Sequence, residues 1–192
     1  MRVLVVSEGK HEQSGALQNL LKRLGGHHHL FEHDRIASTD LPRVHKGKGY
    51  FKKALRWVLQ AQSNGYDALI FLIDEDGITK RVQEIRQAQD HNSLSCLPRA
   101  MGVAIRTFDA WMLADEQVLT KILGYNVNRQ TNPEAIRNPK QLCATLLAKS
   151  QKAMSQSQMY ASLSREIDID ILCDRCQSGF KPFAMRVRNI FQ

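Results

Sequence analysis

Three acidic side chains stand directly after hydrophobic segments of this chain. Glu8 follows the run at residues 2–6, and Asp74 and Asp76 follow the run at residues 67–73. Carboxylate oxygens are hard ligands, which bind Mg²⁺ or Mn²⁺ in preference to softer metals. A divalent cation in such a site neutralises phosphate oxygens and activates water. The three residues therefore predict a metal site that acts on phosphates, with Glu8, Asp74 and Asp76 as its ligands.

The spacing of the two aspartates supports this interpretation. In an extended segment, the side chains of Asp74 and Asp76 emerge on the same side, while that of Glu75 points away. The alternative is that residues 74–77 form only a solvated turn between a strand and a helix, where Asp is favoured as a cap. The segment alone leaves both interpretations open.

The elements that must position these acids can be read from the hydrophobic pattern. The runs at 2–6 and 67–73 are continuous, as expected for strands buried on both faces of a parallel sheet. Apolar residues recur at helical spacing over 12–24, and Gly25 with Gly26 is expected to end that helix. Further strands are expected near 30–36 and 101–106, and further helices near 50–62, 78–90, from about 108, and near 140–154.

Alternation of strands and helices predicts an α/β fold, in which a mostly parallel, doubly wound sheet is flanked by helices. Ligands of such sheets bind beyond the carboxyl ends of the strands, where Glu8 and the two aspartates fall. No strand is obvious after about residue 117. We therefore expect an α/β core over residues 1–116 and a helical C-terminal extension over residues 117–192, packed on the core.

The bulk composition points to an anionic partner. The 192 residues are 43% hydrophobic and carry a formal net charge of +8, with a pI near 9.5. Clustered Lys and Arg favour contact with phosphates, although the same composition also suits simple solubility or an acidic protein partner. No apolar stretch approaches the ~20 residues of a membrane span, and no signal-peptide pattern opens the chain. We expect a cytoplasmic protein, without membrane attachment, whose four cysteines are reduced thiols.

Basic residues close to the predicted site are candidates for binding nucleic acid. The glycines that alternate with lysines at residues 46–49 let a phosphate approach the backbone, while the amines supply charge. The spacing is not that of a Walker A loop, and a solvated basic loop is the alternative. The candidates are Lys10, His11, Lys46, Lys48 and Lys52.

Two segments together resemble the Toprim domain. They are Val-Val-Ser-Glu-Gly-Lys-His-Glu at residues 5–12 and Leu-Ile-Phe-Leu-Ile-Asp-Glu-Asp-Gly at residues 69–77. Residues 105–115, with the pattern acidic-x-Trp-x-Leu-Ala-Asp, and residues 176–183 are similar to a family of small bacterial Toprim-like proteins related to the OLD nucleases. The resemblance covers most of the chain and implies a Toprim-like, Rossmann-like fold, in which the Glu and the Asp-x-Asp bind metal and act on phosphodiester bonds.

The resemblance implies a Mg²⁺-dependent nuclease that acts on DNA in preference to RNA. Such a nuclease would work beside a separate ABC-type or AAA-type ATPase in defence or repair. Glu8 would be a metal ligand or a general base. Asp109, one methylene shorter than the Glu usual in that family, would join the catalytic residues, in contact with the metal directly or through water. The alternative is a catalytically silent subunit that binds nucleic acid or regulates a partner on a Toprim scaffold.

Other candidate ligands have weaker support. The histidines at 27–29 with His33, and the pair Cys173 and Cys176, lack the regularly spaced partners of a closed zinc site. Asp115 is expected to cap or end a helix instead of binding metal.

Overall fold

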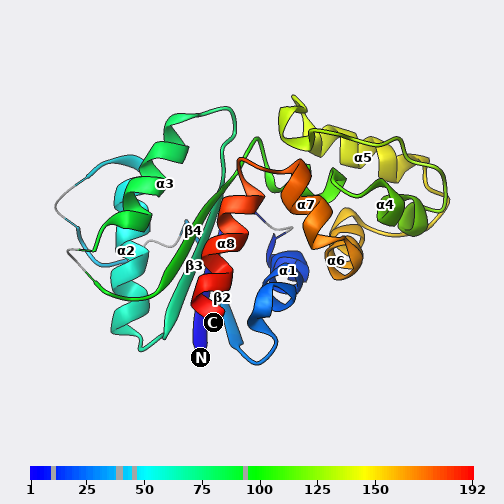
Figure 1. Ribbon diagram of the computed structural model, residues 1–192. Coiled ribbons are helices and arrows are strands. Elements are labelled where there is room, and N and C mark those ends of the chain that lie inside the picture. The colour runs from blue at the N-terminus through cyan, green and yellow to red at the C-terminus, as the bar shows by residue number, and fades with distance from the viewer. Residues whose placement is uncertain (10–11, 38–40, 45–46, 93–94) are drawn as a thin grey trace.

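Four parallel strands lie at the centre of the molecule, in the order β2-β1-β3-β4 (Figure 1). The structure is a computed structural model, and it describes residues 1–9, 12–37, 41–44, 47–92 and 95–192. Parallel neighbours need connections that cross back over a face of the sheet, which is where the helices lie. The strands are β1 (Arg2–Ser7), β2 (Leu30–Arg35), β3 (Ala68–Asp74) and β4 (Arg99–Ala104). The expected α/β fold with a parallel sheet is confirmed.

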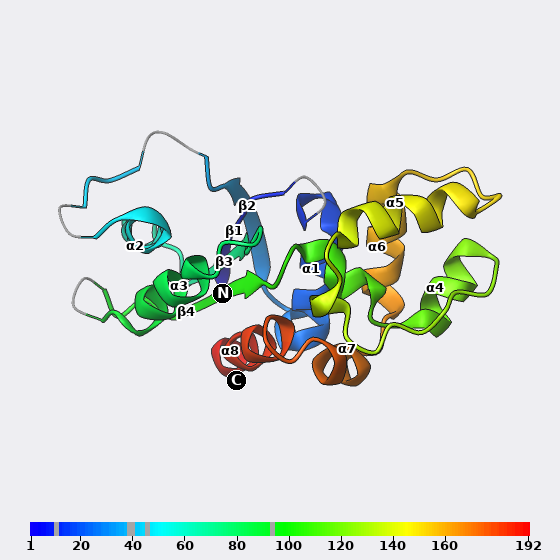
Figure 2. The same ribbon diagram turned by 90° about the horizontal axis from the view of Figure 1, so that it is seen from above.

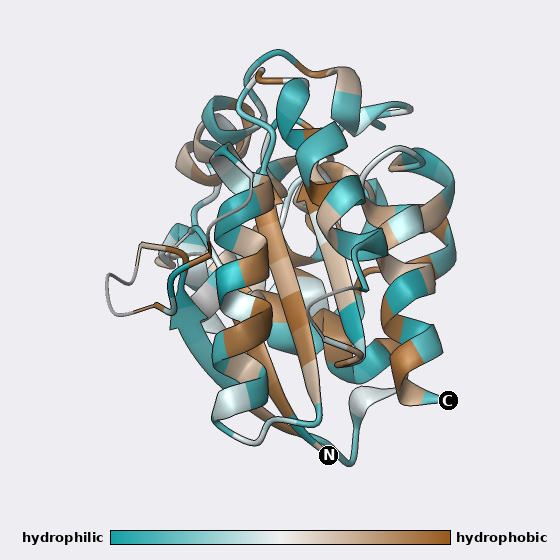
Figure 3. Cartoon of the chain, turned by 90° about the vertical axis from the view of Figure 1, so that its left-hand side faces the viewer, coloured by the Kyte–Doolittle hydropathy of each residue, from teal (hydrophilic) through white to brown (hydrophobic). Residues whose placement is uncertain are grey.

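Helices cover both faces of the sheet (Figure 1). One face carries α2 (Gly49–Ser63) and α3 (Lys80–Asp90), and the other carries α1 (Leu17–Leu21) and α8 (Phe180–Phe191). The central strands are apolar along their length, whereas the helices alternate between apolar and polar faces (Figure 3). No described helix has both the length and the hydrophobicity that a transmembrane span requires.

Strand β3 shows how the two layers divide the core. Leu69, Phe71 and Ile73 belong to the hydrophobic cluster under α2 and α3, while Ile70 and Leu72 belong to the cluster under α1 and α8. All five side chains are at most 1% exposed. Because successive side chains of a strand point to opposite faces, a strand covered on both sides must be apolar throughout.

The C-terminal region is helical, and its helices between residues 116 and 175 lie beside α1, on the side away from α2 and α3 (Figure 2). Trp111 joins this region to the sheet. Its fully buried ring lies 5.3, 5.0 and 5.8 Å from the rings of Phe108, Phe180 and Phe183, measured between centroids. The helices between β4 and α8 are η3 (Phe108–Leu113), α4 (Glu116–Leu123), η4 (Pro133–Ala135), α5 (Pro139–Lys149), α6 (Gln156–Glu166) and α7 (Ile169–Arg175).

The first helix differs from the continuous helix expected over residues 12–24. Short α1 lies between two π-helical segments, η1 (Glu12–Ala16) and η2 (Lys22–Gly26). Gly15 and Gly25 have φ angles of 100° and 118°, which break the helical path. Smaller differences concern β4, which begins two residues before the expected strand, and η3, which is a 3₁₀ helix.

Strand β4 is an edge strand of the sheet, and side chains form hydrogen bonds with the backbone groups on its outer side. Gln89 Oε1 accepts a hydrogen bond from Met101 N at 2.8 Å, and Gln89 Nε2 donates to Arg99 O at 3.0 Å. Arg186 Nη1, from α8, donates to Met101 O at 2.6 Å. These groups of Arg99 and Met101 are therefore satisfied without a fifth strand.

Candidate functional site

The order of the strands creates a switch point between β1 and β3. The chain passes from β1 to β2 on one side and later places β3 on the other side of β1. The helices that follow the two central strands therefore lie on opposite faces of the sheet. In open α/β sheets this arrangement opens a crevice at the carboxyl ends of the two strands, where ligands bind. Glu8 Oε2 accepts a hydrogen bond from Asp74 N at 3.1 Å. The structure therefore places Glu8 and Asp74 together at this crevice.

Asp74 is the last residue of β3, and its carboxylate is largely withdrawn from solvent. Its Oδ1 atom accepts a hydrogen bond from Phe108 N at 2.8 Å. Burial raises the pKa of Asp74 to about 8, and the neighbouring charges of Glu12, Asp76 and Asp109 act in the same direction. The site thus concentrates acidic groups where little water is available to stabilise their charge.

Asp76 does not continue the extended geometry expected of the Asp-x-Asp segment. β3 ends at Asp74, and Asp76 has a φ angle of 51°, in the left-handed region. Its backbone N–H donates to Arg106 O at 2.9 Å. Glu75 is buried and accepts from Arg106 N at 3.2 Å. The prediction that Asp74 and Asp76 belong to one extended segment is therefore wrong, because the chain turns directly after Asp74.

Arg81, in the first turn of α3, connects the three acidic residues. Its Nη1 atom lies 2.7 Å from Asp76 Oδ2 and 3.9 Å from Glu8 Oε2. The same nitrogen donates to Asp74 O at 2.7 Å. One guanidinium group therefore supplies positive charge between Glu8 and Asp76.

Tyr50 contacts Glu8 from the start of α2. Its hydroxyl donates a hydrogen bond to Glu8 Oε1. The Arg81 guanidinium and Lys53 Nζ lie 4.8 and 4.6 Å from the centre of its ring. Burial and the hydrogen bond to Glu8 raise the pKa of Tyr50 to about 12, so the hydroxyl keeps its proton at neutral pH. Sequence reasoning missed this residue, because no pattern in residues 50–62 indicates that Tyr50 contacts Glu8.

Glu12 is a second residue that sequence reasoning did not assign to the site. It is 3% exposed, and burial, together with the charges of Asp109 and Glu8, raises its pKa to about 7. A Cβ atom on Gly9 would come within 2.0 Å of Glu12 Oε2, so a larger residue at position 9 would displace the Glu12 carboxylate from this place. The spacing Glu-Gly-x-x-Glu at residues 8–12 is the signal that could have identified Glu12.

Asp109 is buried at the border between the sheet and the C-terminal helices. The Tyr160 hydroxyl and Gln156 Nε2, both from α6, donate hydrogen bonds to its Oδ1 atom, the latter at 3.2 Å. Cys143 Sγ, from α5, donates to Asp109 O at 3.6 Å. Because its charge raises the pKa values of Asp74 and Glu12, Asp109 belongs to the same acidic cluster. The C-terminal region thus helps to build the site.

We expect Tyr160→Phe to lower the free energy of unfolding by about 1 to 3 kcal/mol, because it removes a donor from the buried carboxylate of Asp109. Urea denaturation at pH 7 measures the change. Tyr66→Phe is the matched control, since the Tyr66 hydroxyl donates to Glu32, whose side chain is 40% exposed, and its loss should matter less. Equal stability of both variants would contradict this role of Tyr160.

Asp115 is a helix cap. Its Oδ1 atom accepts hydrogen bonds from Gln117 N and Val118 N at 3.1 Å, at the start of α4. Its Oδ2 atom accepts from Asp168 N at 3.0 Å. The expected capping role is confirmed.

The basic candidates are only partly described. Lys10, His11 and Lys46 lie outside the residues that the structure describes. Lys48 is exposed at the N-cap of α2. Whether these side chains bind nucleic acid stays a prediction. Lys52 lines a hollow of about 490 Å³ together with Arg43, Val44 and Arg56.

The chemistry of the donor atoms fits a hard cation. Within the described ranges, no three His, Cys, Asp or Glu side chains already surround a common point as metal ligands do. Yet several carboxylates are crowded at one crevice, and their repulsion favours an added positive charge. Two buried hydroxyl oxygens beside the cluster, Ser7 Oγ and Thr107 Oγ1, have no hydrogen-bond partner in the described structure. Oxygen donors of this kind suit Mg²⁺ or Mn²⁺.

Comparison with known proteins identifies a family. The family described as Domain of unknown function (DUF4276) matches residues 8–188, from Glu8 through most of α8. No curated protein and no solved structure matches the chain. Since the match covers β2, β3 and β4, the acidic cluster and the C-terminal helices, the chain belongs to the DUF4276 family.

Proposed function

We propose that this protein is a nuclease that depends on Mg²⁺ or Mn²⁺ and hydrolyses phosphodiester bonds in nucleic acid, DNA being favoured over RNA. The observation that carries the proposal is the hydrogen bond from Asp74 N to Glu8 Oε2. It joins two acids that are 66 residues apart, at the switch point of the sheet. Carboxylates that repel one another are costly to retain in a buried crevice, and a cation would offset that cost.

The acidic residues would take different chemical roles in the hydrolysis. A divalent cation bound to Glu8, Asp74 and Asp76 would neutralise phosphate oxygens and polarise water. Glu12 has a pKa of about 7, so it can accept or hold a proton near neutral pH, as a general base must. Glu8 bonds through both of its oxygens, to Tyr50 and to Asp74 N, which fixes its orientation.

The second candidate function is a catalytically silent subunit that binds nucleic acid or regulates a partner. The position of Arg81 favours it, since this guanidinium already compensates Glu8 and Asp76. A cation shared by these two acids would take the place that Arg81 Nη1 now fills. A partner ATPase, a role in defence or repair, and a cytoplasmic location belong to the proposal in either form.

We expect wild-type protein to cleave plasmid DNA or structured RNA with Mg²⁺ or Mn²⁺ but not with EDTA. Glu8→Gln should reduce the rate by a factor of about 10² to 10³, because it removes negative charge from the reacting centre. Asp174→Asn, at an exposed position of α7, is the matched control and should retain activity.

Equal cleavage by wild type and Glu8→Gln would contradict the proposed site. Absence of cleavage, combined with tight and salt-sensitive binding of nucleic acid by both proteins, would favour the silent subunit. The same assay should therefore include binding measurements at two salt concentrations.

A further inference from the structure

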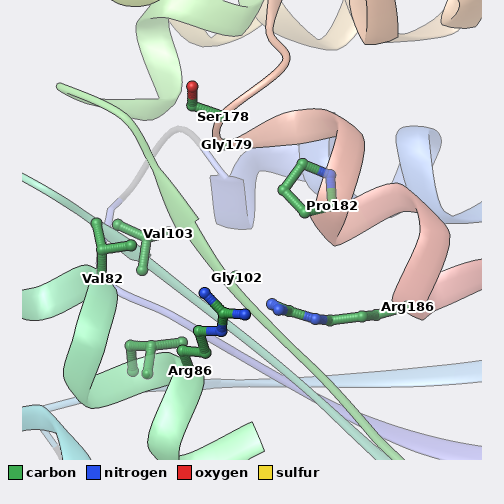
Figure 4. Close-up of a pocket in the computed structure, with 9 residues that line it drawn as sticks. Val82, Arg86, Gly102, Val103, Ser178, Gly179, Pro182 and Arg186 are labelled. Carbon is green, nitrogen blue, oxygen red and sulfur yellow. The ribbon is translucent and has the colours of Figure 1, made fainter.

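A pocket of about 320 Å³ lies between α3 and α8, beside strand β4. Arg86 comes from α3 and Arg186 from α8, while Gly102 belongs to β4 (Figure 4). Val82 and Pro182 provide apolar walls. The pocket is separate from the acidic crevice, and the proposed nuclease chemistry does not use it.

The two arginines face one another across the pocket. Figure 4 shows their side chains reaching from opposite walls toward the strand at Gly102. Among the ion pairs of the described residues, neither arginine has a carboxylate partner within 4.0 Å. Burial lowers the pKa of Arg186. The charge of Asp90 acts in the opposite direction, and the charge of Arg86, a smaller effect, lowers it further. Two cations held together in this way favour an anion between them.

Within the described part of the chain, most donor groups of the two arginines have no protein partner and can bind a ligand. Arg186 uses Nη1 to bond Met101 O, and a guanidinium group carries five N–H donors. The backbone N–H groups at the start of α8 are already used, because Ser178 N and Gly179 N donate to Glu134 at 2.9 and 2.8 Å. Recognition of an anion must therefore come from the arginine side chains.

We propose that this pocket binds a phosphate group, with Arg86 and Arg186 as its two cationic ligands. The planar guanidinium fork matches the oxygens of a phosphate and can bind them in pairs. The apolar walls exclude water from one side, which strengthens such bonds. The pocket is also large enough for the sugar that accompanies a phosphate in a nucleotide.

The location suggests the source of the phosphate, and this step rests on the proposed nuclease function. Helix α3 carries Arg81 at the acidic cluster and, five residues later, Arg86 in the pocket. Val103 of the pocket precedes Ala104, which pairs with Asp74. A nucleic-acid strand with one phosphate at the acids can therefore place another phosphate here. A free nucleotide is the other source of the same chemical group.

The test is carried out in EDTA, so that binding does not depend on a metal. Inorganic phosphate and deoxyadenosine 5′-monophosphate are titrated while the amide NMR signals of Gly102, Val103 and Gly179 are followed. A labelled single-stranded DNA is titrated by fluorescence anisotropy. Arg86→Gln should weaken binding of phosphate by about tenfold, and Arg186→Lys, which keeps the charge but not the fork, should weaken it less. Arg188→Gln, an exposed change on α8, is the control and should bind as wild type does.

Absence of signal changes at the pocket, with equal affinities for Arg86→Gln and Arg188→Gln, would overturn the proposal. Loss of phosphate and nucleotide binding in Arg86→Gln, with unchanged DNA binding, would support the pocket with a free nucleotide as its occupant. Loss of both would support the nucleic-acid strand. Because Glu8 lies outside the pocket, Glu8→Gln should bind phosphate normally. A failure to cleave with intact phosphate binding therefore counts against the nuclease alone.

Discussion

Asp74→Asn should lower metal-dependent cleavage by a factor of about 10³ and, at pH 8 in EDTA, raise the melting temperature by about 5 °C. The loss of activity follows from the loss of a charged oxygen at the crevice. The gain in stability follows from the cost of ionising a carboxylate that burial and Glu12 disfavour. Asn keeps an oxygen that can accept the hydrogen bond from Phe108 N.

The sign of the pH dependence follows from the direction of the shift. The pKa of Asp74 is raised from 3.8 to about 8 in the folded protein, so folding favours the protonated form. This contribution to stability is complete below pH 4 and is lost as the pH rises through 8. Each pKa unit corresponds to about 1.4 kcal/mol, and partial solvent access reduces the total to the order of 2 kcal/mol at pH 8.

Melting curves from pH 4 to pH 8.5 measure the effect. The difference between Asp74→Asn and wild type should grow with pH and vanish near pH 4, while Asp174→Asn should show no such trend. A difference that does not change with pH would contradict the assignment of Asp74 as a buried, protonated group.

Trp111→Ala should lower the free energy of unfolding by about 3 to 5 kcal/mol, a large part of the total for a protein of this size. The Trp111 ring is fully buried and contacts the rings of Phe108, Phe180 and Phe183. Its removal leaves a cavity where η3, α8 and the sheet meet. Unfolding by urea, followed by circular dichroism, measures the loss.

Trp111→Phe serves as the conservative comparison, since it retains an aromatic ring and should cost less. A loss below about 1 kcal/mol in Trp111→Ala would show that the aromatic cluster does not hold the C-terminal helices on the sheet. The Trp111 side chain cannot stack on a nucleic-acid base, because none of it is exposed.

The strands and two of the acids could be predicted for a clear physical reason. β1 and β3 are buried on both faces, so their sequences are continuous apolar runs that have no helical alternative of that length. The carboxyl ends of parallel strands lie at the same edge. Glu8 and Asp74, which follow or end these runs, therefore had to lie near one another.

The rest of the cluster depends on packing that the sequence does not display. Tyr50 reaches Glu8 across 42 residues, and Tyr160 reaches Asp109 across 51 residues, each through the placement of a whole helix. The turn at Asp76 has a local cause, and a turn at residues 74–77 was the alternative that the sequence left open: Gly77 follows Asp76 with a φ angle of 73°. Asp-Gly is a common turn pair, and it ended the extended segment.

The side chains that bond the outer rim of β4 also limit how this molecule can assemble. An extended peptide that aligned itself along β4 would find Met101 N and Met101 O already bonded, to Gln89 and Arg186. A strand of a second copy could pair along this edge only by breaking these hydrogen bonds, which disfavours such pairing. A partner that docks at this edge of the sheet would contact the guanidinium and amide side chains of Arg186 and Gln89 instead of unpaired backbone groups.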